Sequence, residues 1–174
     1  HYSSRRQRQM CIRDSFLTVN EFRERINDGQ FLEHAKVFGN LYGTPLEPVV
    51  ESINDGKDLI FDVDWQGGKQ IRSSSLSKFV ISIFILPPSI KALQERLMKR
   101  AQDSSETVKD RMTKSIGEIM HWKEYDYVIV NNNFEQTLHE VKSIITSEKL
   151  RRVRNSQLED FVETLTYEFK ELKS

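Results

Sequence analysis

From residue 16 onwards, the spacing of apolar residues predicts short strands that alternate with amphipathic helices. Three apolar runs have the length and composition of core strands: residues 58–64 (DLIFDVD), 79–86 (FVISIFIL) and 125–130 (YDYVIV). Helices are predicted where apolar residues recur every three or four positions, at about 90–100, 106–121, 134–150 and 157–172. This alternation favours an α/β domain with a mostly parallel sheet.

Two earlier helices carry start and stop signals of their own. Thr18 and Glu21 have the spacing of a capping box, and the helix that they begin ends at an Asn-Asp-Gly sequence that closes with Gly29. The second helix is predicted to be capped by Thr44, with Pro45 at its first position, and it ends at the same Asn-Asp-Gly sequence.

The stretch between these two helices has a different pattern. Residues 31–38 (FLEHAKVF) alternate, so that Glu33 shares one face with every second residue, and a Gly-Asn turn leads into residues 41–43, which can return as a second strand. We therefore expect a small antiparallel hairpin inserted into the otherwise parallel scheme.

Composition and charge narrow the class of protein. The chain has 174 residues, of which 30% are charged and 37% hydrophobic, and its 26 basic and 26 acidic residues give a net charge of zero. These values are typical of a globular domain with no general attraction for nucleic acid or an anionic membrane. No apolar run approaches the ~20 residues of a membrane span, and the single cysteine, Cys11, cannot form an intrachain disulfide. We expect a cytoplasmic protein without nucleic-acid or membrane partners.

In open α/β sheets, ligands bind beyond the carboxyl ends of the strands, which here means Asp62, Asp64, Pro87 and Asn131. Asp62 and Asp64 lie two apart on a predicted strand, so their side chains should point the same way. Two such carboxylates repel each other, and Mg²⁺ or a ligand amine would stabilise them. The alternative is a pair of helix-capping carboxylates for the segment after Trp65.

Three arginines form a second candidate group. Arg96 and Arg100 are one turn apart on a predicted helix, and Arg111 follows on the next helix, across the loop 101–105 (AQDSS). Arginines that converge across a hinged loop suit the negative charge of a phosphoryl group during transfer. The alternative is a solvated helical face.

A third group lies on the hairpin, where Glu33 is on the alternating strand and Tyr42 and Thr44 flank the returning one. A carboxylate can accept hydrogen bonds from both N1–H and N2–H₂ of guanine, a donor pair that adenine lacks. A hydroxyl that donates to guanine O6 would further increase the selectivity for guanine over adenine. The alternative is a surface glutamate, a half-buried tyrosine and a helix cap.

Taken together, several long segments resemble guanylate kinases, in the order and spacing of that family: FLEHAKVFGNLYGTP (31–45), LIFDVDWQGGKQIR (59–72), IFILPPS (83–89), RLMKRAQDS (96–104) and YDYVIVNN (125–132). The resemblance extends from Phe16 to about Leu150. It implies the parallel sheet of a P-loop nucleoside monophosphate kinase, with helices on both faces, a small antiparallel GMP-binding insertion and a lid. The implied reaction is ATP + GMP to ADP + GDP, with Mg²⁺ accompanying ATP.

The resemblance also implies roles on the GMP side. Glu33 and Thr44 would recognise guanine, and Tyr42 would hold the GMP phosphate. Asp62, which we also expect to be catalytic, and Asp64 would lie between the GMP site and Mg²⁺, with Asp64 nearer the base.

On the ATP side, the resemblance implies a lid at about residues 97–111. From this lid, Arg100 and Arg111 would close on the ATP phosphates, while Arg96 would lie beside the transferred group. Asn131 would sit near the adenine.

One departure from the family concerns the front of the chain. Family members begin with a strand and a loop of the form G-x-x-x-x-G-K-[ST], which cradles the ATP phosphates, and this sequence contains no such motif. We therefore expect an N-terminally truncated guanylate kinase that is inactive as written. We also expect that the coding DNA upstream of Phe16 encodes the loop.

The first residues raise a related question. Residues 3–8 (SSRRQR) match the family's GMP-phosphate segment, [ST]-[ST]-R-x-x-R, but they lie about three residues too close to Phe16. We interpret residues 1–15 as foreign. The remaining segments are then 16–45 with the GMP-binding insertion, 46–154 with the core and lid, and 155–174 with a C-terminal amphipathic helix.

Two alternatives to a catalytic guanylate kinase stay open. One is a non-catalytic guanylate kinase-like binding module, of the kind that binds peptides in scaffold proteins. The other is a different nucleoside monophosphate kinase, against which Glu33 in the hairpin speaks.

Overall fold

A computed structural model describes residues 17–37, 40–100, 105–155 and 157–173. The chain divides after Val80 into two compact units, and each is described by itself. Residues 1–15, which we interpret as foreign, lie outside the described residues. So do residues 101–104, at the tip of the predicted lid.

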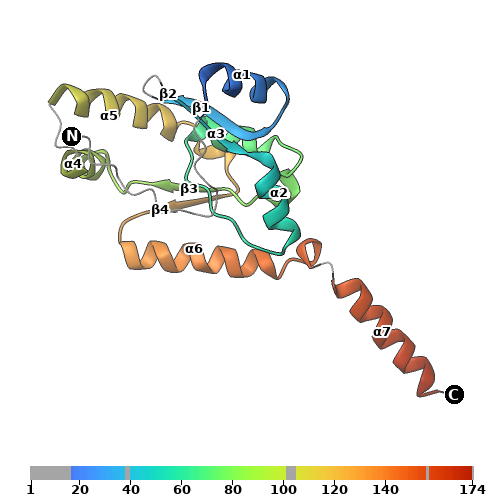
Figure 1. Ribbon diagram of the computed structural model, residues 1–174. Helices are drawn as coiled ribbons and strands as arrows, with labels where there is room; N and C mark the ends of the chain where they lie inside the picture. Colours follow the sequence, from blue (N-terminus) through green and yellow to red (C-terminus); the bar gives the residue numbers. More distant parts are fainter. Residues whose placement is uncertain (1–16, 38–39, 101–104, 156, 174) are drawn as a thin grey trace. The chain divides into compact units, whose positions relative to one another are not determined.

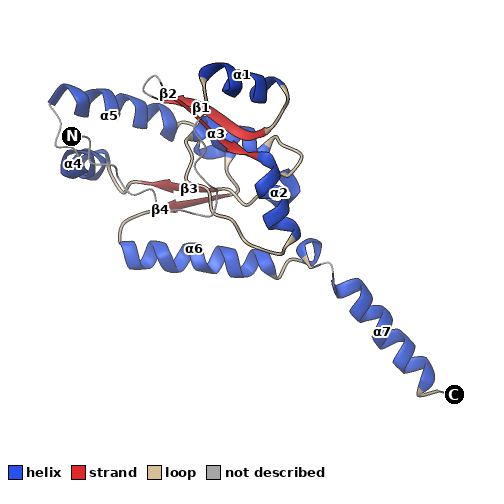
Figure 2. Ribbon diagram, viewed as in Figure 1, coloured by secondary structure: helices blue, strands red, loops and turns tan. Residues whose placement is uncertain are grey.

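The first unit contains the hairpin that the alternating pattern predicts (Figures 1 and 2). Its elements are α1 (Val19–Asn27), β1 (Phe31–Val37), β2 (Asn40–Pro45), α2 (Leu46–Asn54), α3 (Trp65–Arg72) and a 3-10 turn (Ser77–Phe79). Strands β1 and β2 pair in antiparallel register, with Glu33 opposite Thr44 and Ala35 opposite Tyr42. The predicted antiparallel insertion is therefore confirmed.

The start of α1 is also as predicted. The Thr18 hydroxyl accepts from the Glu21 N–H at 3.3 Å, and the Glu21 carboxylate accepts from the Thr18 N–H at 2.7 Å. This backbone hydrogen bond, together with one from the Thr18 hydroxyl, lowers the pKa of Glu21. Gly29 ends the helix with a φ of 65°, in the left-handed region that glycine adopts without strain.

The predicted cap of α2 is wrong. Pro45 occupies the N-cap position of this helix, and no side chain caps it. Thr44 is still part of β2, where the hairpin register places it opposite Glu33. Its hydroxyl therefore bonds to the Glu33 carboxylate instead of a helix N–H.

The predicted strand at 58–64 is also wrong, because residues 57–64 have no regular secondary structure. A strand needs a hydrogen-bonded neighbour, and within the described part of the first unit only β1 and β2 pair with each other. Leu59 and Phe61 nevertheless pack against the core of the unit, while Ile60 is 63% exposed. Buried and exposed side chains therefore still alternate along residues 59–61, although this segment forms no hydrogen bonds of a β-sheet.

The core of the first unit lies between the hairpin and its two following helices. Leu32, Val49 and Ile71 are buried together and join β1, α2 and α3. On the side of α1, the Phe22 ring stacks on Phe31 at a centroid distance of 4.6 Å. These contacts fix α3 against the hairpin, which positions the site described below.

The second unit contains the parallel pairing that the sequence predicts. Its elements are β3 (Ile83–Leu86), α4 (Ile90–Arg100), α5 (Ser105–Ile119), a 3-10 turn (Trp122–Glu124), β4 (Tyr127–Val130), α6 (Phe134–Lys149), a 3-10 turn (Arg152–Arg154) and α7 (Gln157–Glu171). Strands β3 and β4 run parallel, with Ile83 opposite Tyr127 and Leu86 opposite Val130. β3 is shorter than the predicted 79–86, because Phe79 belongs to the 3-10 turn and residues 80–82 have no regular secondary structure.

One side of β4 is buried and the other is exposed. Ile129 is 5% exposed on the strand that α6 packs against, whereas Val128 and Val130 are 39% and 46% exposed. No helix in the described ranges is both long and apolar enough to cross a membrane.

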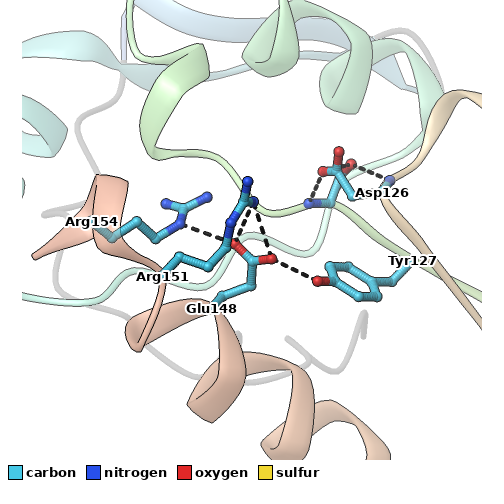
Figure 3. A network of polar contacts seen from close by, with 6 residues as sticks. Asp126, Tyr127, Glu148, Arg151 and Arg154 are labelled. Atoms are coloured by element: carbon cyan, nitrogen blue, oxygen red, sulfur yellow. Dashed lines mark hydrogen bonds and ion pairs between the residues drawn. The ribbon is translucent and has the colours of Figure 1, made fainter.

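Two polar networks hold the strands of the second unit in place (Figure 3). At the start of the ladder, Asp126 accepts from the N–H and the hydroxyl of Ser82 at 2.8 and 2.6 Å. The second network centres on Glu148, which is buried at the end of α6 and accepts from the Tyr127 hydroxyl at 2.6 Å. The guanidinium groups of Arg151 and Arg154 complete it at 3.2 and 3.0 Å.

The Glu148 network predicts a pH dependence. The hydrogen bond from Tyr127, followed by those from Arg151 and Arg154, lowers the pKa of Glu148, and the same bond raises the pKa of Tyr127. A carboxyl with a lowered folded-state pKa contributes stability above its unfolded pKa, and this contribution is lost as the pH falls through the folded pKa. Urea unfolding between pH 7 and 3 should show this loss in the parent chain.

Glu148→Gln should show a shallower fall in unfolding free energy over that acid range. Glu135→Gln, which changes an exposed carboxylate on the same helix, should follow the parent. Equal slopes for the parent and Glu148→Gln would mean that the network does not hold an ionised carboxylate.

Candidate functional site

The hairpin buries one carboxylate of the predicted site. Glu33 is only 8% exposed, and its Oε1 accepts a hydrogen bond from the Thr44 hydroxyl at 2.6 Å. The antiparallel register places these two residues opposite each other, so the pair is a direct product of the hairpin. Tyr42 lies two residues before Thr44 on β2, hence on the same face, and is 51% exposed.

The start of α3 lies against this carboxylate. Asp64 is the N-cap of α3, and its Oδ1 accepts from the Gly67 N–H at 2.9 Å. A Cβ on Gly67 would lie 3.1 Å from Glu33 Oε2, closer than almost all real Cβ contacts. Glycine therefore allows the first turn of α3 to approach the Glu33 carboxylate.

The two predicted aspartates have different environments. Asp64 acts as a helix cap, which is the alternative that the sequence left open, while Asp62 is exposed in the irregular segment before α3. We expected the side chains of Asp62 and Asp64 to point the same way because both would lie on a strand at 58–64, and residues 57–64 do not form that strand. In the residues that the structure describes, no group of three or more His, Cys, Asp or Glu side chains could hold a metal ion.

Gln70 fastens α3 to β1 beside Glu33. Its side-chain Oε1 accepts from the His34 N–H at 3.0 Å, and its Nε2 donates to the His34 carbonyl at 2.9 Å. Both backbone groups of the residue after Glu33 are thereby held by one amide. No local sequence pattern could predict this contact, because the Gln70 side chain bonds a backbone 36 residues away.

The close approach at Gly67 predicts the effect of a small substitution. Gly67→Ala should push the Glu33 carboxylate or the first turn of α3 outwards, because the new methyl would also meet the Val63 Cβ at 3.1 Å. We expect about tenfold weaker binding of any ligand that Glu33 recognises. Calorimetric titration measures this loss.

A control separates the close contact from a general effect of replacing glycine. Gly117→Ala adds the same methyl group to the solvent side of α5, where nothing lies within 4 Å. It should leave ligand binding unchanged. Unaltered affinity in Gly67→Ala would show that Glu33 does not need its present position.

The second unit joins two of the other predicted residues. Arg96 on α4 donates from Nη2 to the backbone carbonyl of Asn131 at 2.8 Å, and the Asn131 N–H donates to the Leu86 carbonyl at 2.8 Å. The Asn131 side chain accepts from Thr137 at 3.2 Å. Arg96 and Asn131 thus meet at the carboxyl ends of β3 and β4, where the rule for α/β sheets places ligands.

The convergence of the three arginines remains a prediction. Arg111 is half-buried on α5, whereas the Arg100 side chain and residues 101–104 lie outside the described part of the chain. Helices α4 and α5 do pack against each other. The predicted GMP-side residues all belong to the first unit and the predicted ATP-side residues to the second.

Comparisons with known proteins agree with these motifs. The family model for guanylate kinase matches residues 8–148. A guanylate kinase from Cereibacter sphaeroides is 51% identical over 154 residues, which are 88% of this chain and 73% of that protein. A guanylate kinase from Jannaschia sp. is 50% identical over 158 residues, or 91% and 72% of the two chains.

The fold leads to the same family. The crystal structure of guanylate kinase from Anaplasma phagocytophilum matches with a TM-score of 0.71 and 30% sequence identity, over 93% of this chain and 79% of that one. The fold is accordingly that of the P-loop nucleoside monophosphate kinases. With most of its length matched in sequence and in structure, the chain belongs to the guanylate kinase family.

Proposed function

We propose that the first unit binds GMP through the buried Glu33 carboxylate, for the ATP-dependent phosphorylation of GMP to GDP. Guanylate kinases are phosphotransferases that use ATP as co-substrate, and the chain is a member of that family. The observation that carries the proposal is the pair formed by Glu33 and Thr44, at 2.6 Å on facing strands.

The hydrogen-bonding capacity of this pair fits guanine. The Thr44 hydroxyl has one proton and donates it to Glu33, so its oxygen can only accept from a ligand. A carboxylate such as that of Glu33 likewise offers acceptors. Guanine offers the donors N1–H and N2–H₂, which match two acceptors. The hydroxyl donor expected near O6 is therefore not Thr44 in this arrangement.

The phosphate of GMP needs a donor at some distance from the base. Tyr42 lies on the same face of β2 as Thr44, and its ring is half exposed. A phenolic O–H donates well to a phosphate oxygen. We therefore assign Tyr42 to the GMP phosphate.

On the ATP side, we propose that Arg96, Arg100 and Arg111 stabilise the negative charge of the transferred group, with Asn131 near the adenine. Mg²⁺ would enter with ATP, since this ion is usually held by phosphates and one or two carboxylates. Asp64 already accepts from Gly67, which leaves the exposed Asp62 as the better candidate to face the ion. Nucleotide substrates and the single cysteine favour a cytoplasmic site of action.

A non-catalytic binding module is the alternative, and the comparisons do not favour it. The relatives at 51% and 50% identity are guanylate kinases by name. We therefore expect nucleotide binding rather than peptide recognition to be the role of the hairpin.

Calorimetric titration of the 174-residue chain with GMP, IMP and AMP tests the proposal. GMP should bind most tightly, IMP more weakly because hypoxanthine lacks the N2 amino group, and AMP at least about tenfold more weakly because adenine has no N1–H. Equal affinity for AMP and GMP would overturn the assignment of Glu33.

A further inference from the structure

The amide of Gln70 is fully engaged by backbone groups next to Glu33. Its Oε1 accepts from the His34 N–H at 3.0 Å, and its Nε2 donates to the His34 carbonyl at 2.9 Å. Nε2 also donates to the Gln66 carbonyl, one helical turn earlier, at 3.5 Å. An amide that uses its oxygen and both of its N–H donors has a fixed orientation. This side chain therefore ties α3 to β1 at a set distance.

The ladder of the hairpin is irregular just before Glu33. In the register, Phe31 lies opposite Pro45. Glu33 lies opposite Thr44, so β1 advances by two residues where β2 advances by one. An extra residue on one strand interrupts the ladder and changes the direction of the side chain beside it. The backbone at Glu33 therefore depends on contacts that lie beyond the irregularity, and His34 is the first residue there.

The contacts that meet this part of β1 come from one face of α3. Gly67 and Gln70 are three residues apart and hence neighbours on the helix surface. Gly67 lies against the Glu33 side chain, where an added Cβ would be 3.1 Å from Oε2, and Gln70 holds the backbone of the next residue. The same helix face thus sets the place of the Glu33 carboxylate and the place of the strand that carries it.

We propose that Gln70 is a positioning residue for base selection. Its amide holds β1 against α3, so that the Glu33 carboxylate keeps the place from which it distinguishes guanine from adenine. This inference rests on the proposed binding of GMP by Glu33. Gln70 acts through Glu33 and not by touching the nucleotide, and a displacement of about 1 Å in such a group costs up to roughly 10²-fold in its effect.

Gln70→Met removes the tie and keeps the shape. Methionine has about the length of glutamine and favours a helix, but it forms neither hydrogen bond to His34. Water can take over both backbone groups at this part-buried edge, so the change loses position rather than the fold. The GMP affinity of the chain should fall about tenfold and the AMP affinity less than about twofold, because adenine offers Glu33 no N1–H.

Calorimetric titrations with GMP and AMP measure the ratio of the two affinities. A general loosening of the first unit would weaken both nucleotides alike and leave this ratio unchanged, whereas a displaced Glu33 lowers it. The matched control is Gln66→Met, the same exchange one turn earlier on α3, where the side chain is exposed. It should bind both nucleotides like the parent. An equal fall of the ratio in Gln66→Met and Gln70→Met would overturn the proposal.

A double-mutant cycle shows whether Gln70 acts through Glu33. With Glu33→Gln already present, the carboxylate that reads the base is gone. Adding Gln70→Met should then lower the GMP affinity by less than about twofold. A further loss of about tenfold, as in the parent background, would mean that the two residues act independently. That result would overturn the positioning role.

The same titrations separate this proposal from the proposed function. If Glu33→Gln leaves the ratio of GMP to AMP affinity unchanged, Glu33 does not read the base, and both proposals are overturned. If Glu33→Gln lowers the ratio and Gln70→Met does not, only the positioning role is overturned.

A second variant covers the case in which Gln70→Met is unfolded by circular dichroism. Gln70→Glu keeps an acceptor for the His34 N–H but sets a second oxygen against the His34 carbonyl, so half of the tie is lost. It should lower the ratio of GMP to AMP affinity in the same direction. A folded Gln70→Glu chain with the ratio of the parent would overturn the proposal.

Discussion

Replacing Glu33 with glutamine should weaken GMP binding by about 5- to 150-fold, which corresponds to the cost of about 1–3 kcal/mol for a mispaired buried polar group. The Thr44 hydroxyl donates to Glu33 Oε1, and the amide oxygen of a glutamine can take over that bond. The amide NH₂ would then face the donors of guanine. Two donors cannot pair, so the substitution keeps the fold of the hairpin and loses its selectivity.

Calorimetry with GMP and IMP measures this effect on the chain. The loss should be larger for GMP than for IMP, because only guanine has the N2 amino group. Glu47→Gln is the control, since Glu47 is an exposed carboxylate on α2, close in sequence to the hairpin. Unchanged GMP affinity in Glu33→Gln would show that Glu33 does not contact the base.

The second large effect concerns catalysis. We expect the 174-residue chain to bind GMP but to show no measurable phosphoryl transfer. The rate of phosphoryl transfer comes from positioning and from electrostatic stabilisation. The sequence contains no G-x-x-x-x-G-K-[ST] motif to supply backbone N–H groups and a lysine to the ATP phosphates. Arg100 and Arg111 by themselves do not fix the β- and γ-phosphates in line with GMP.

A coupled assay with ATP, GMP and Mg²⁺ measures the turnover, and calorimetry on the same sample confirms that GMP is bound. Turnover within the ordinary enzyme range of about 1–10³ per second would contradict the expectation. It would mean that another part of this chain holds the ATP phosphates.

Local signals in the sequence predicted much of the fold. The Thr18 capping box, the glycine that ends α1, the hairpin and the apolar runs of β3 and β4 all follow from patterns within a few residues. Each of these depends on backbone preferences or on side chains that are neighbours along the chain. Such features can be read without knowing what lies nearby in space.

The two errors in the first unit have a common cause. Local patterns predict a helix cap at Thr44 and a strand that ends at Asp64. In both cases, however, the structure formed depends on residues that are distant in sequence. Glu33 on the facing strand takes the Thr44 hydroxyl, and residues 57–64 have no strand beside them within the described unit. A local motif predicts what a side chain can bond, while the tertiary neighbour decides what it does bond.

The structure brings together one pair of predicted residues on the GMP side, Glu33 and Thr44, and one on the ATP side, Arg96 and Asn131. Glu33 and Thr44 are opposite each other because the alternating pattern and the turn fix the register of the hairpin. The contact of Arg96 with the backbone of Asn131 could not be predicted, because it joins α4 to the end of a strand 35 residues later. The same is true of the hydrogen bond from Tyr127 to Glu148, which forms only when α6 lies against β4.

The amide of Gln70 has a consequence for aggregation. Among the described residues of the first unit, β1 pairs with β2 alone, so its other edge presents backbone N–H and C=O groups that a strand of another molecule could bind. Gln70 occupies both groups of His34, near the middle of that edge, at 3.0 and 2.9 Å. An incoming strand would have to displace this side chain before it could form a continuous ladder. The contact that orients α3 beside Glu33 thus also blocks the growth of an intermolecular sheet along the hairpin.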